Sequence, residues 1–283
     1  MIENSTGTIA RFAPSPSGRL HLGHAYSALF TKRAAAGGRF LLRIEDIDLA
    51  RCRPEFEEGI YEDLAWLGLK WETPARRQSD HFDDYHAALR KLDENGLIYP
   101  CFCTRKDIQR EIGQAGRAPH GPDGILYPGT CRALSPEDRA ALAAAGEPHA
   151  LRLDMRKAVD AAGPLTFDDR ERGRMIVDGP GCGDVVLARK DVPTSYHLAV
   201  TVDDAIQGVT LVTRGEDLLH ATHIHRILQA LLGLPEPEYW HHGLLTGEDG
   251  KRYAKRDKSL TIQALREAGR GPAEVRKLAG FAD

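Results

Sequence analysis

The first 44 residues place the strongest limit on the fold of this chain. Residues 8–14 (TIARFAP) are largely apolar and end at a proline, which predicts a short buried strand. A turn-rich loop follows, and small and apolar residues then recur at helical spacing over 21–36 until two glycines stop the helix. Residues 39–44 (RFLLRI) predict a second strand. This order forms a βαβ unit, so we expect a parallel sheet with right-handed crossovers.

The rest of the chain predicts further α/β alternation with one interruption. Between about 100 and 183, glycine, proline and charged residues dominate and cysteines cluster, which predicts an insertion subdomain. Elsewhere the patterns predict helices over 54–67, 80–95 and 218–232, and a further helix that begins at about Ser195. They predict strands over 184–189, 208–214 and 242–246.

These elements predict an α/β fold built on a Rossmann-like, doubly wound parallel sheet. Its first half is expected over residues 1–99, the insertion over 100–183 and its second half over 184–250. Residues 251–283 are expected to form a lysine-containing loop and a short helical tail.

The loop after the first strand reads RFAPSPSGRLHLGH over residues 11–24. It places His21 and His24 three residues apart in the first turn of the helix, on neighbouring positions of one face. A helix N-terminus offers free N–H groups and partial positive charge to a phosphate. Gly23 removes a side chain between the histidines, so a nucleotide can approach the backbone. Imidazole N–H donors can stabilise charge on phosphorus as pyrophosphate leaves.

In this context the chain resembles a class I aminoacyl-tRNA synthetase. Segment 11–24 resembles the glutamate-specific branch, and residues 43–48 (RIEDID) resemble the next block of that branch. Residues 252–256 (RYAKR) stand where the family has Lys-Met-Ser-Lys-Ser, and Lys255 keeps the second lysine. The resemblance implies that the catalytic residues are His21, His24 and Lys255, and that ATP is bound by His21, Gly23, His24 and Lys255.

A glutamate pocket needs at least two cationic donors and one anionic acceptor, because glutamate has two carboxylates and one ammonium and buried charges must be paired. Arg11 and Arg214 lie at strand ends on the ligand-facing edge of the predicted sheet, and Glu45 can hold the ammonium. The resemblance implies that glutamate contacts Arg11, Phe12, Ala13, Pro14, Ser15, Glu45, Tyr196 and Arg214.

Cys101, Cys103 and Cys131 suggest three thiolates of a structural zinc site, which normally has four ligands. By chemistry the fourth is His120, Tyr127 or water, and the alternative to any metal is three buried thiols. Residues 127–131 (YPGTC) resemble a family segment whose tyrosine oxygen is a ligand, which implies Tyr127.

Other residues of metal-binding type are interpreted as structural. No carboxylate or cysteine lies near His220, His223 and His225 in the sequence, so these are read as ordinary helix positions. Cys52 and Cys182 have no partner by spacing.

The resemblance runs from about residue 8 to 265 and stops where a full glutamyl-tRNA synthetase continues into an anticodon-binding region, so no such domain is expected. Shortened members of this branch form glutamyl-adenylate without tRNA and attach glutamate to the queuosine base in the anticodon of tRNA(Asp). The resemblance implies ATP, L-glutamate and queuosine-bearing tRNA(Asp) as partners, Mg²⁺ with ATP, and one structural Zn²⁺ per chain.

Three other functions remain open on the sequence. The chain could charge the 3′ end of tRNA(Glu), could adenylylate another acid, since other nucleotidyl transferases use the same histidine motif, or could be a non-catalytic zinc-containing RNA-binding module. The net charge of −3 means that any nucleic acid must meet local basic patches.

Composition favours a cytoplasmic protein without membrane contact, and a monomer is expected. No apolar run reaches 18 residues, and the N-terminus lacks the basic and apolar regions of a secretory signal. Five cysteines are too few, and odd in number, for a disulfide scaffold, so reduced thiols are expected.

Overall fold

The computed structural model describes residues 7–114, 120–121, 124–245 and 261–281. Its centre is a seven-stranded sheet in which every strand pair is parallel except β8–β9. This confirms the predicted α/β class with a mostly parallel sheet. In spatial order the strands are β3 (Glu72–Arg77), β2 (Arg39–Ile44), β1 (Ile9–Phe12), β11 (Leu211–Gly215), β12 (Glu238–His242), β8 (Thr166–Asp169) and β9 (Gly173–Ile176).

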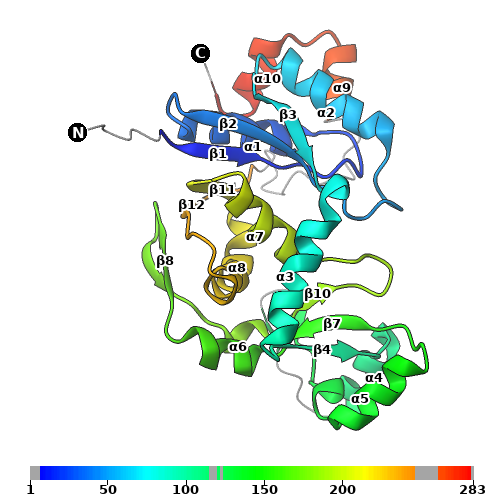
Figure 1. The fold of residues 1–283 in the computed structure, drawn as a ribbon. Helices are drawn as coiled ribbons and strands as arrows, with labels where there is room; N and C mark the ends of the chain where they lie inside the picture. Colours follow the sequence, from blue (N-terminus) through cyan, green and yellow to red (C-terminus); the bar gives the residue numbers. More distant parts are fainter. Residues whose placement is uncertain (1–6, 115–119, 122–123, 246–260, 282–283) are drawn as a thin grey trace.

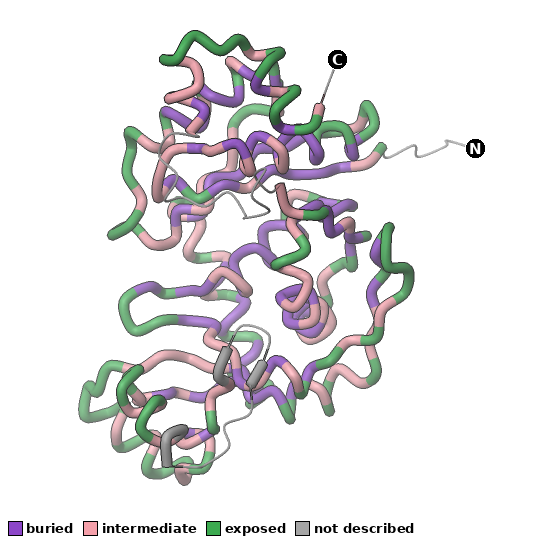
Figure 2. Tube along the Cα trace, turned by 180° about the vertical axis from the view of Figure 1, so that it is seen from behind, coloured by how far each residue is buried: buried purple, intermediate pink, exposed green. Residues whose placement is uncertain are grey.

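Helices cover both faces of this sheet (Figure 1). One face carries α1 (Leu22–Ala34), α2 (Pro54–Trp66), α9 (Ile262–Glu267) and α10 (Pro272–Leu278). The other carries α7 (Tyr196–Ile206) and α8 (Leu219–Leu232), against which α3 (Phe82–Glu94) packs. Figure 2 shows buried positions running through the centre of the molecule and exposed positions along its outer loops.

The alternation of side chains along β1 directs one functional residue toward α7. Ala10 and Phe12 pack with residues of α1, whereas Ile9 packs with the cluster on the opposite face. Arg11 therefore points to the α7 side, where it pairs with Asp204. Arg43 of β2 points the same way and pairs with the same carboxylate.

The insertion is built on a separate antiparallel sheet of β10 (Val186–Ala188), β7 (Ala150–Leu153) and β4 (Ile98–Cys101). In Figure 1 it lies at the opposite end of the molecule from α9 and α10. Its helices are α4 (Arg105–Gln114) and α5 (Pro136–Ala144), a two-stranded ribbon pairs β5 (His120–Gly121) with β6 (Gly124–Ile125), and α6 (Met155–Ala162) leads back toward β8.

The expected boundary at 183/184 does not separate the strands of the two sheets. Strands on each side of it join the sheet expected for the other side. Strands β8 and β9, from the expected insertion, extend the central sheet because Phe167 packs on Tyr239 at 5.5 Å between ring centroids and Asp169 binds His241. Strand β10, expected to resume the central sheet, pairs instead with β7. The last described strand ends at His242, so the strand predicted over 242–246 was wrong in position.

No helix among the described residues is both long enough and apolar enough to span a bilayer.

Candidate active site

A cavity of about 690 Å³ opens where β1, β2 and β11 end and α1 and α7 begin. All of the expected glutamate and phosphate contacts that the structure describes border this one cavity. They are Arg11, Phe12, Ala13, Pro14, Ser15, His21, Gly23, His24, Glu45, Tyr196 and Arg214. Lys255 and the rest of segment 252–256 lie outside the described residues.

His21 and His24 together cap the start of α1. The Gly23 N–H donates to His21 Nδ1 at 3.1 Å, and the His21 N–H donates to His24 Nδ1 at 3.2 Å. Because both Nδ1 atoms accept, each ring is neutral with its proton on Nε2. The ring centroids lie 3.8 Å apart. The helix N-terminus therefore holds two imidazole donors at the edge of the cavity.

Gly23 fits closely beneath these rings. A Cβ atom at this position would lie 3.0 Å from His21 Cε1, which is tighter than ordinary van der Waals contact. A side chain here would require the His21 ring to shift by a few tenths of an ångström, so the close approach favours glycine.

Two arginines of the central strands share one counter-ion. Arg11 Nε donates to Asp204 Oδ1 at 2.8 Å, and Arg43 Nη1 donates to the same oxygen at 2.8 Å. Arg43 also lies 3.4 Å from Glu45 Oε1 and 3.8 Å from Asp203 Oδ2. This buried network fixes the direction of Arg11 and holds Glu45 at the cavity wall.

Glu45 is one of two acidic groups among the described residues that line the cavity, the other being Asp217. Burial raises its pKa, and the neighbouring Arg43 and Arg11 oppose that rise. An ammonium group placed beside Glu45 would stabilise the ionised carboxylate further. Its position suits an amino group of a ligand.

Arg214 differs from Arg11 in the charge of its partners. Nε donates to His241 Nε2 at 3.2 Å, Nη1 donates to His225 Nδ1 at 3.1 Å, and Nη2 donates to the Thr222 hydroxyl. Across the described part of the chain no carboxylate lies within ion-pair distance of Arg214, although the residue is only 5% exposed. A buried guanidinium with neutral partners favours an anionic ligand.

Tyr196, the first residue of α7, closes the cavity beside this guanidinium. Its ring meets those of His197 and His225 edge-on, each at 5.6 Å between centroids. Burial raises the pKa of its hydroxyl, which is therefore neutral and able to donate a hydrogen bond.

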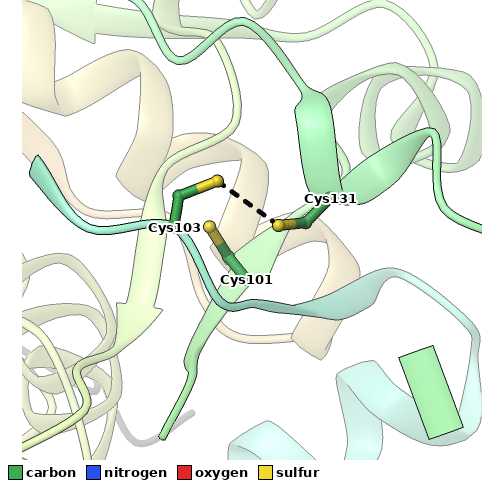
Figure 3. Close-up of side chains that lie close together, drawn as sticks. All are labelled: Cys101, Cys103 and Cys131. Atoms are coloured by element: carbon green, nitrogen blue, oxygen red, sulfur yellow. Dashed lines mark hydrogen bonds between the residues drawn. The ribbon is translucent and has the colours of Figure 1, made fainter. Parts of the chain in front are cut away.

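The predicted cysteine ligands converge at the end of β4 (Figure 3). The sulfurs of Cys101, Cys103 and Cys131 lie within 4.8 Å of one another, with Cys103 Sγ 3.4 Å from Cys131 Sγ. The Tyr127 hydroxyl lies 3.5 Å from Cys103 Sγ. A tetrahedral zinc with Zn–S bonds of about 2.3 Å separates its ligands by about 3.8 Å. The donor set is therefore compatible with zinc.

A bound cation would have to offset the burial of these groups. Burial raises the pKa of Cys103 to about 12, so a bound cation is needed to hold it as a thiolate. Burial likewise raises the pKa of Tyr127, so its hydroxyl is protonated unless a cation binds, although the guanidinium of Arg152 lies 3.9 Å from the centroid of its ring. The side chain of His120, the other candidate ligand, lies outside the described part.

The other candidate histidines and cysteines do not gather. His225 Nδ1 faces Arg214, whereas His223 Nδ1 accepts the Asp178 N–H at 3.0 Å. Within the described residues the cysteine trio is the one metal-capable group. Cys52 and Cys182 lie outside it and form no disulfide.

Sequence reasoning missed two groups that build the site. Asp204 lies eight positions after Tyr196, and this i, i+8 spacing, which puts both on one face of α7, could have revealed it. His225 was read as an ordinary helix position, but it is buried and binds Arg214. His225 belongs to helix α8 and its partner to strand β11, so no local spacing indicates this contact.

Comparison with known proteins finds a family model for the catalytic domain of class I tRNA synthetases (E and Q) that matches residues 8–279. The chain is 50% identical over 281 residues to a glutamyl-Q tRNA(Asp) synthetase of Rhodobacter capsulatus, covering 96% of this chain and 100% of the relative. It is 46% identical to one of Nocardia farcinica, covering 95% and 82%. A crystal structure of a glutamate tRNA ligase from Elizabethkingia meningosepticum in complex with its amino acid has a TM-score of 0.73 at 30% identity, covering 89% of this chain and 52% of that one.

Proposed function

The chain belongs to the class I tRNA synthetases of the E and Q type, and from this we propose that it activates L-glutamate with ATP, without tRNA, and transfers it to the queuosine base in the anticodon of tRNA(Asp). The names of its relatives from Rhodobacter capsulatus and Nocardia farcinica support this acceptor.

The contrast between Arg214 and Arg11 carries the proposal. Arg11 is already neutralised by Asp204, whereas the described partners of Arg214 are all uncharged. An acidic amino acid supplies the missing carboxylate, and the planar guanidinium suits it. Glu45 then takes the ammonium, while Arg11 and the Tyr196 hydroxyl donate to the remaining carboxylate oxygens.

Activation joins a glutamate carboxylate oxygen to the α-phosphorus of ATP. The bond from that phosphorus to the bridging oxygen breaks, and pyrophosphate leaves with the electron pair. The Nε2–H groups of His21 and His24 stabilise the phosphate oxygens, together with the N-terminus of α1. Lys255 lies outside the described residues, and the resemblance implies that its ammonium stabilises the same negative charge on the phosphates. Mg²⁺ bound to ATP would offset further negative charge.

Transfer joins a hydroxyl oxygen of the queuosine cyclopentenediol to the acyl carbon of glutamyl-adenylate. The acyl–oxygen bond of the mixed anhydride breaks, and AMP leaves with the electron pair. The hydroxyl proton passes to the departing phosphate or to water. Positioning supplies most of the acceleration in such a step, since the anhydride is already activated.

A structural role is proposed for the cysteine group. Zn²⁺ held by Cys101, Cys103, Tyr127 and Cys131 would tie the end of β4 to the turn before α5. These residues lie outside the active-site cavity, so the ion would support the insertion without entering the reaction.

The test is glutamate-dependent ATP–pyrophosphate exchange without tRNA, followed by transfer of labelled glutamate to tRNA(Asp) with and without queuosine. Exchange with glutamate but not aspartate or glutamine, and transfer only to the modified tRNA, is expected. Exchange with another acid, or no exchange at all, would contradict the activation step.

The same assay separates the alternatives. Mapping the labelled nucleotide shows whether glutamate is at the anticodon or at the 3′ end. Transfer to the 3′ end of tRNA(Glu) would replace the proposed acceptor while leaving the activation step in place. Binding of RNA without exchange would instead identify a non-catalytic module.

A further inference from the structure

A second cavity, of about 600 Å³, adjoins the active-site cavity. The two share Ser15, Glu45 and Tyr196 as wall residues. The second cavity extends toward the insertion, where Arg152 and Val186 of its sheet line the far side. A group bound here would therefore lie directly beside the ligand of the first cavity.

His197 lines this second cavity and connects it to Arg214 through His225. Arg214 Nη1 lies 3.1 Å from His225 Nδ1, and His225 Nε2 lies 3.2 Å from His197 Nδ1. The Arg214 guanidinium lines the first cavity, so the chain of contacts crosses from one cavity to the other.

The direction of these hydrogen bonds is fixed by the arginine. A guanidinium only donates, so His225 Nδ1 must accept and its proton lies on Nε2. That Nε2–H donates to His197 Nδ1, which leaves the proton of the neutral His197 ring on Nε2. Burial lowers the pKa of His197 to about 4, with Arg214 adding to the effect, so the ring is neutral at pH 7.

Three other polar side chains of the second cavity have hydrogen-bond partners. Asp48 accepts from Arg189 at 2.9 Å, Arg152 donates to the Asp184 carbonyl at 2.7 Å, and the Gln78 amide donates to Asp203 at 2.8 Å. By contrast, His197 Nε2 forms no hydrogen bond within the described part of the chain. A donor of fixed tautomer is therefore presented at the junction with the active site.

We propose that His197 is a positioning residue for acyl transfer, which donates its Nε2–H to the acceptor nucleotide of the RNA in the second cavity. This rests on the proposed function, because an RNA acceptor must approach the acyl carbon from beside the glutamate and ATP sites. The fixed tautomer makes His197 a hydrogen-bond donor and excludes its Nε2 as the base that removes the hydroxyl proton.

Three substitutions distinguish the effect of the Nε2–H donor of His197 from the effect of its ring volume. In His197→Gln the amide nitrogen can reach the place of Nε2, whereas in His197→Asn the shorter side chain reaches only as far as Nδ1. His197→Phe keeps the ring volume without a donor. His86→Asn is the control, since His86 is a half-exposed histidine of α3 that pairs only with Asp83 among the described residues.

Enzyme carrying labelled glutamyl-adenylate is isolated and mixed with excess tRNA for a single turnover. The Asn and Phe variants are expected to transfer about tenfold more slowly than wild type, on the scale of one lost hydrogen bond, and the Gln variant to recover most of that loss. Transfer by the Asn variant at the wild-type rate, or by the Gln variant as slowly as by Phe, would overturn the proposal.

A different outcome of the same assay shows whether the proposed function is wrong, independently of the role of His197. The assay uses whichever tRNA the wild type charges, so a wild type that charges tRNA(Glu) contradicts the queuosine acceptor and still tests His197. A wild type that forms adenylate and transfers it to no tRNA contradicts both.

A second measurement tests the tautomer without any tRNA. In protein labelled with ¹⁵N-histidine, two-bond nitrogen–proton correlations should show the His197 proton on Nε2. In His225→Phe, which breaks the chain of contacts, that preference should weaken. A wild-type His197 carrying its proton on Nδ1 would overturn the inference.

Discussion

Asp204 binds Arg11 by two parallel hydrogen bonds, from Nε to Oδ1 at 2.8 Å and from Nη2 to Oδ2 at 3.2 Å. The two side chains are only 9% and 5% exposed. Because Oδ1 also accepts from Arg43, one carboxylate of α7 compensates two strand arginines. The site therefore keeps Arg11 oriented but neutralised, whereas Arg214 has no carboxylate partner among the described residues.

The substitution Asp204→Asn should destabilise the whole domain. It removes the carboxylate that Arg11 and Arg43 share and leaves buried Arg11 without an ion-pair partner among the described residues, and breaking a buried pair in this way typically costs about 3–5 kcal/mol. Urea unfolding measures the loss of free energy. A matched control is Glu72→Gln, which removes an equally well-formed fork to Arg39 on the surface and should cost no more than about 1 kcal/mol. Equal losses would contradict the role of burial.

Replacing His21 by asparagine separates its two contributions. Asparagine is a strong N-cap and can accept the Gly23 N–H, so α1 should remain folded. The imidazole donor is lost, and glutamate-dependent exchange should fall by at least tenfold, toward the roughly 10²–10³ typical of a lost transition-state donor. Steady-state exchange and thermal unfolding are measured on the same sample. An unchanged rate with an intact fold would remove His21 from the mechanism.

Zinc content should depend on the three clustered cysteines and not on the total number of cysteines in the chain. Cys101→Ser is expected to lower zinc content and the unfolding temperature more than it lowers glutamate affinity, because the cluster lies outside the active-site cavity. Zinc is measured by elemental analysis after dialysis against a chelator. Cys182→Ser is the control, since Cys182 is a buried cysteine outside the cluster. One zinc per chain in the Cys101 variant would refute the ligand assignment.

Local pattern was sufficient for the first βαβ unit and not for the later strands. The strand at 39–44 and the helix over 54–67 follow from apolar spacing, a proline at the helix start and a following glycine, which act within a few residues. The partner of β8 is instead set by Phe167 against Tyr239, more than 70 positions away. Such a contact leaves no short-range periodicity, so β8 was assigned to the insertion.

The active site likewise contains parts that local sequence predicts and parts that it does not. The loop at 11–24 could be predicted because its histidines cap the helix that they introduce. The surroundings of Arg214 could not, because Thr222, His225 and His241 reach it from two other elements. Whether an arginine is neutralised depends on such distant partners, so the sequence left open which arginine serves which carboxylate.

Stability should fall in mild acid because of buried imidazoles. Burial, with Arg214 adding to the effect, lowers the pKa of His197 and His241 to about 4 and that of His225 well below its ordinary value of 6.5. Between pH 6.5 and 4 the unfolded chain binds protons there that the folded chain does not, so this stability is complete above pH 6.5 and is lost as the pH falls. Asp63 opposes the trend, because burial raises its pKa to about 6 and the folded chain gains that proton.

The contribution of one imidazole is isolated by His197→Gln. Each proton taken up only on unfolding changes the free energy of unfolding by about 1.4 kcal/mol per pH unit. Between pH 6 and 4 the wild type should therefore lose up to about that much more per unit than the variant, whereas above pH 7 the difference between them should be constant. Urea unfolding at intervals of half a pH unit measures both curves. If the unfolding free energies of wild type and variant ran parallel through the acid range, His197 would have the same pKa in the folded and unfolded chain. Burial and Arg214 would then not hold its ring neutral.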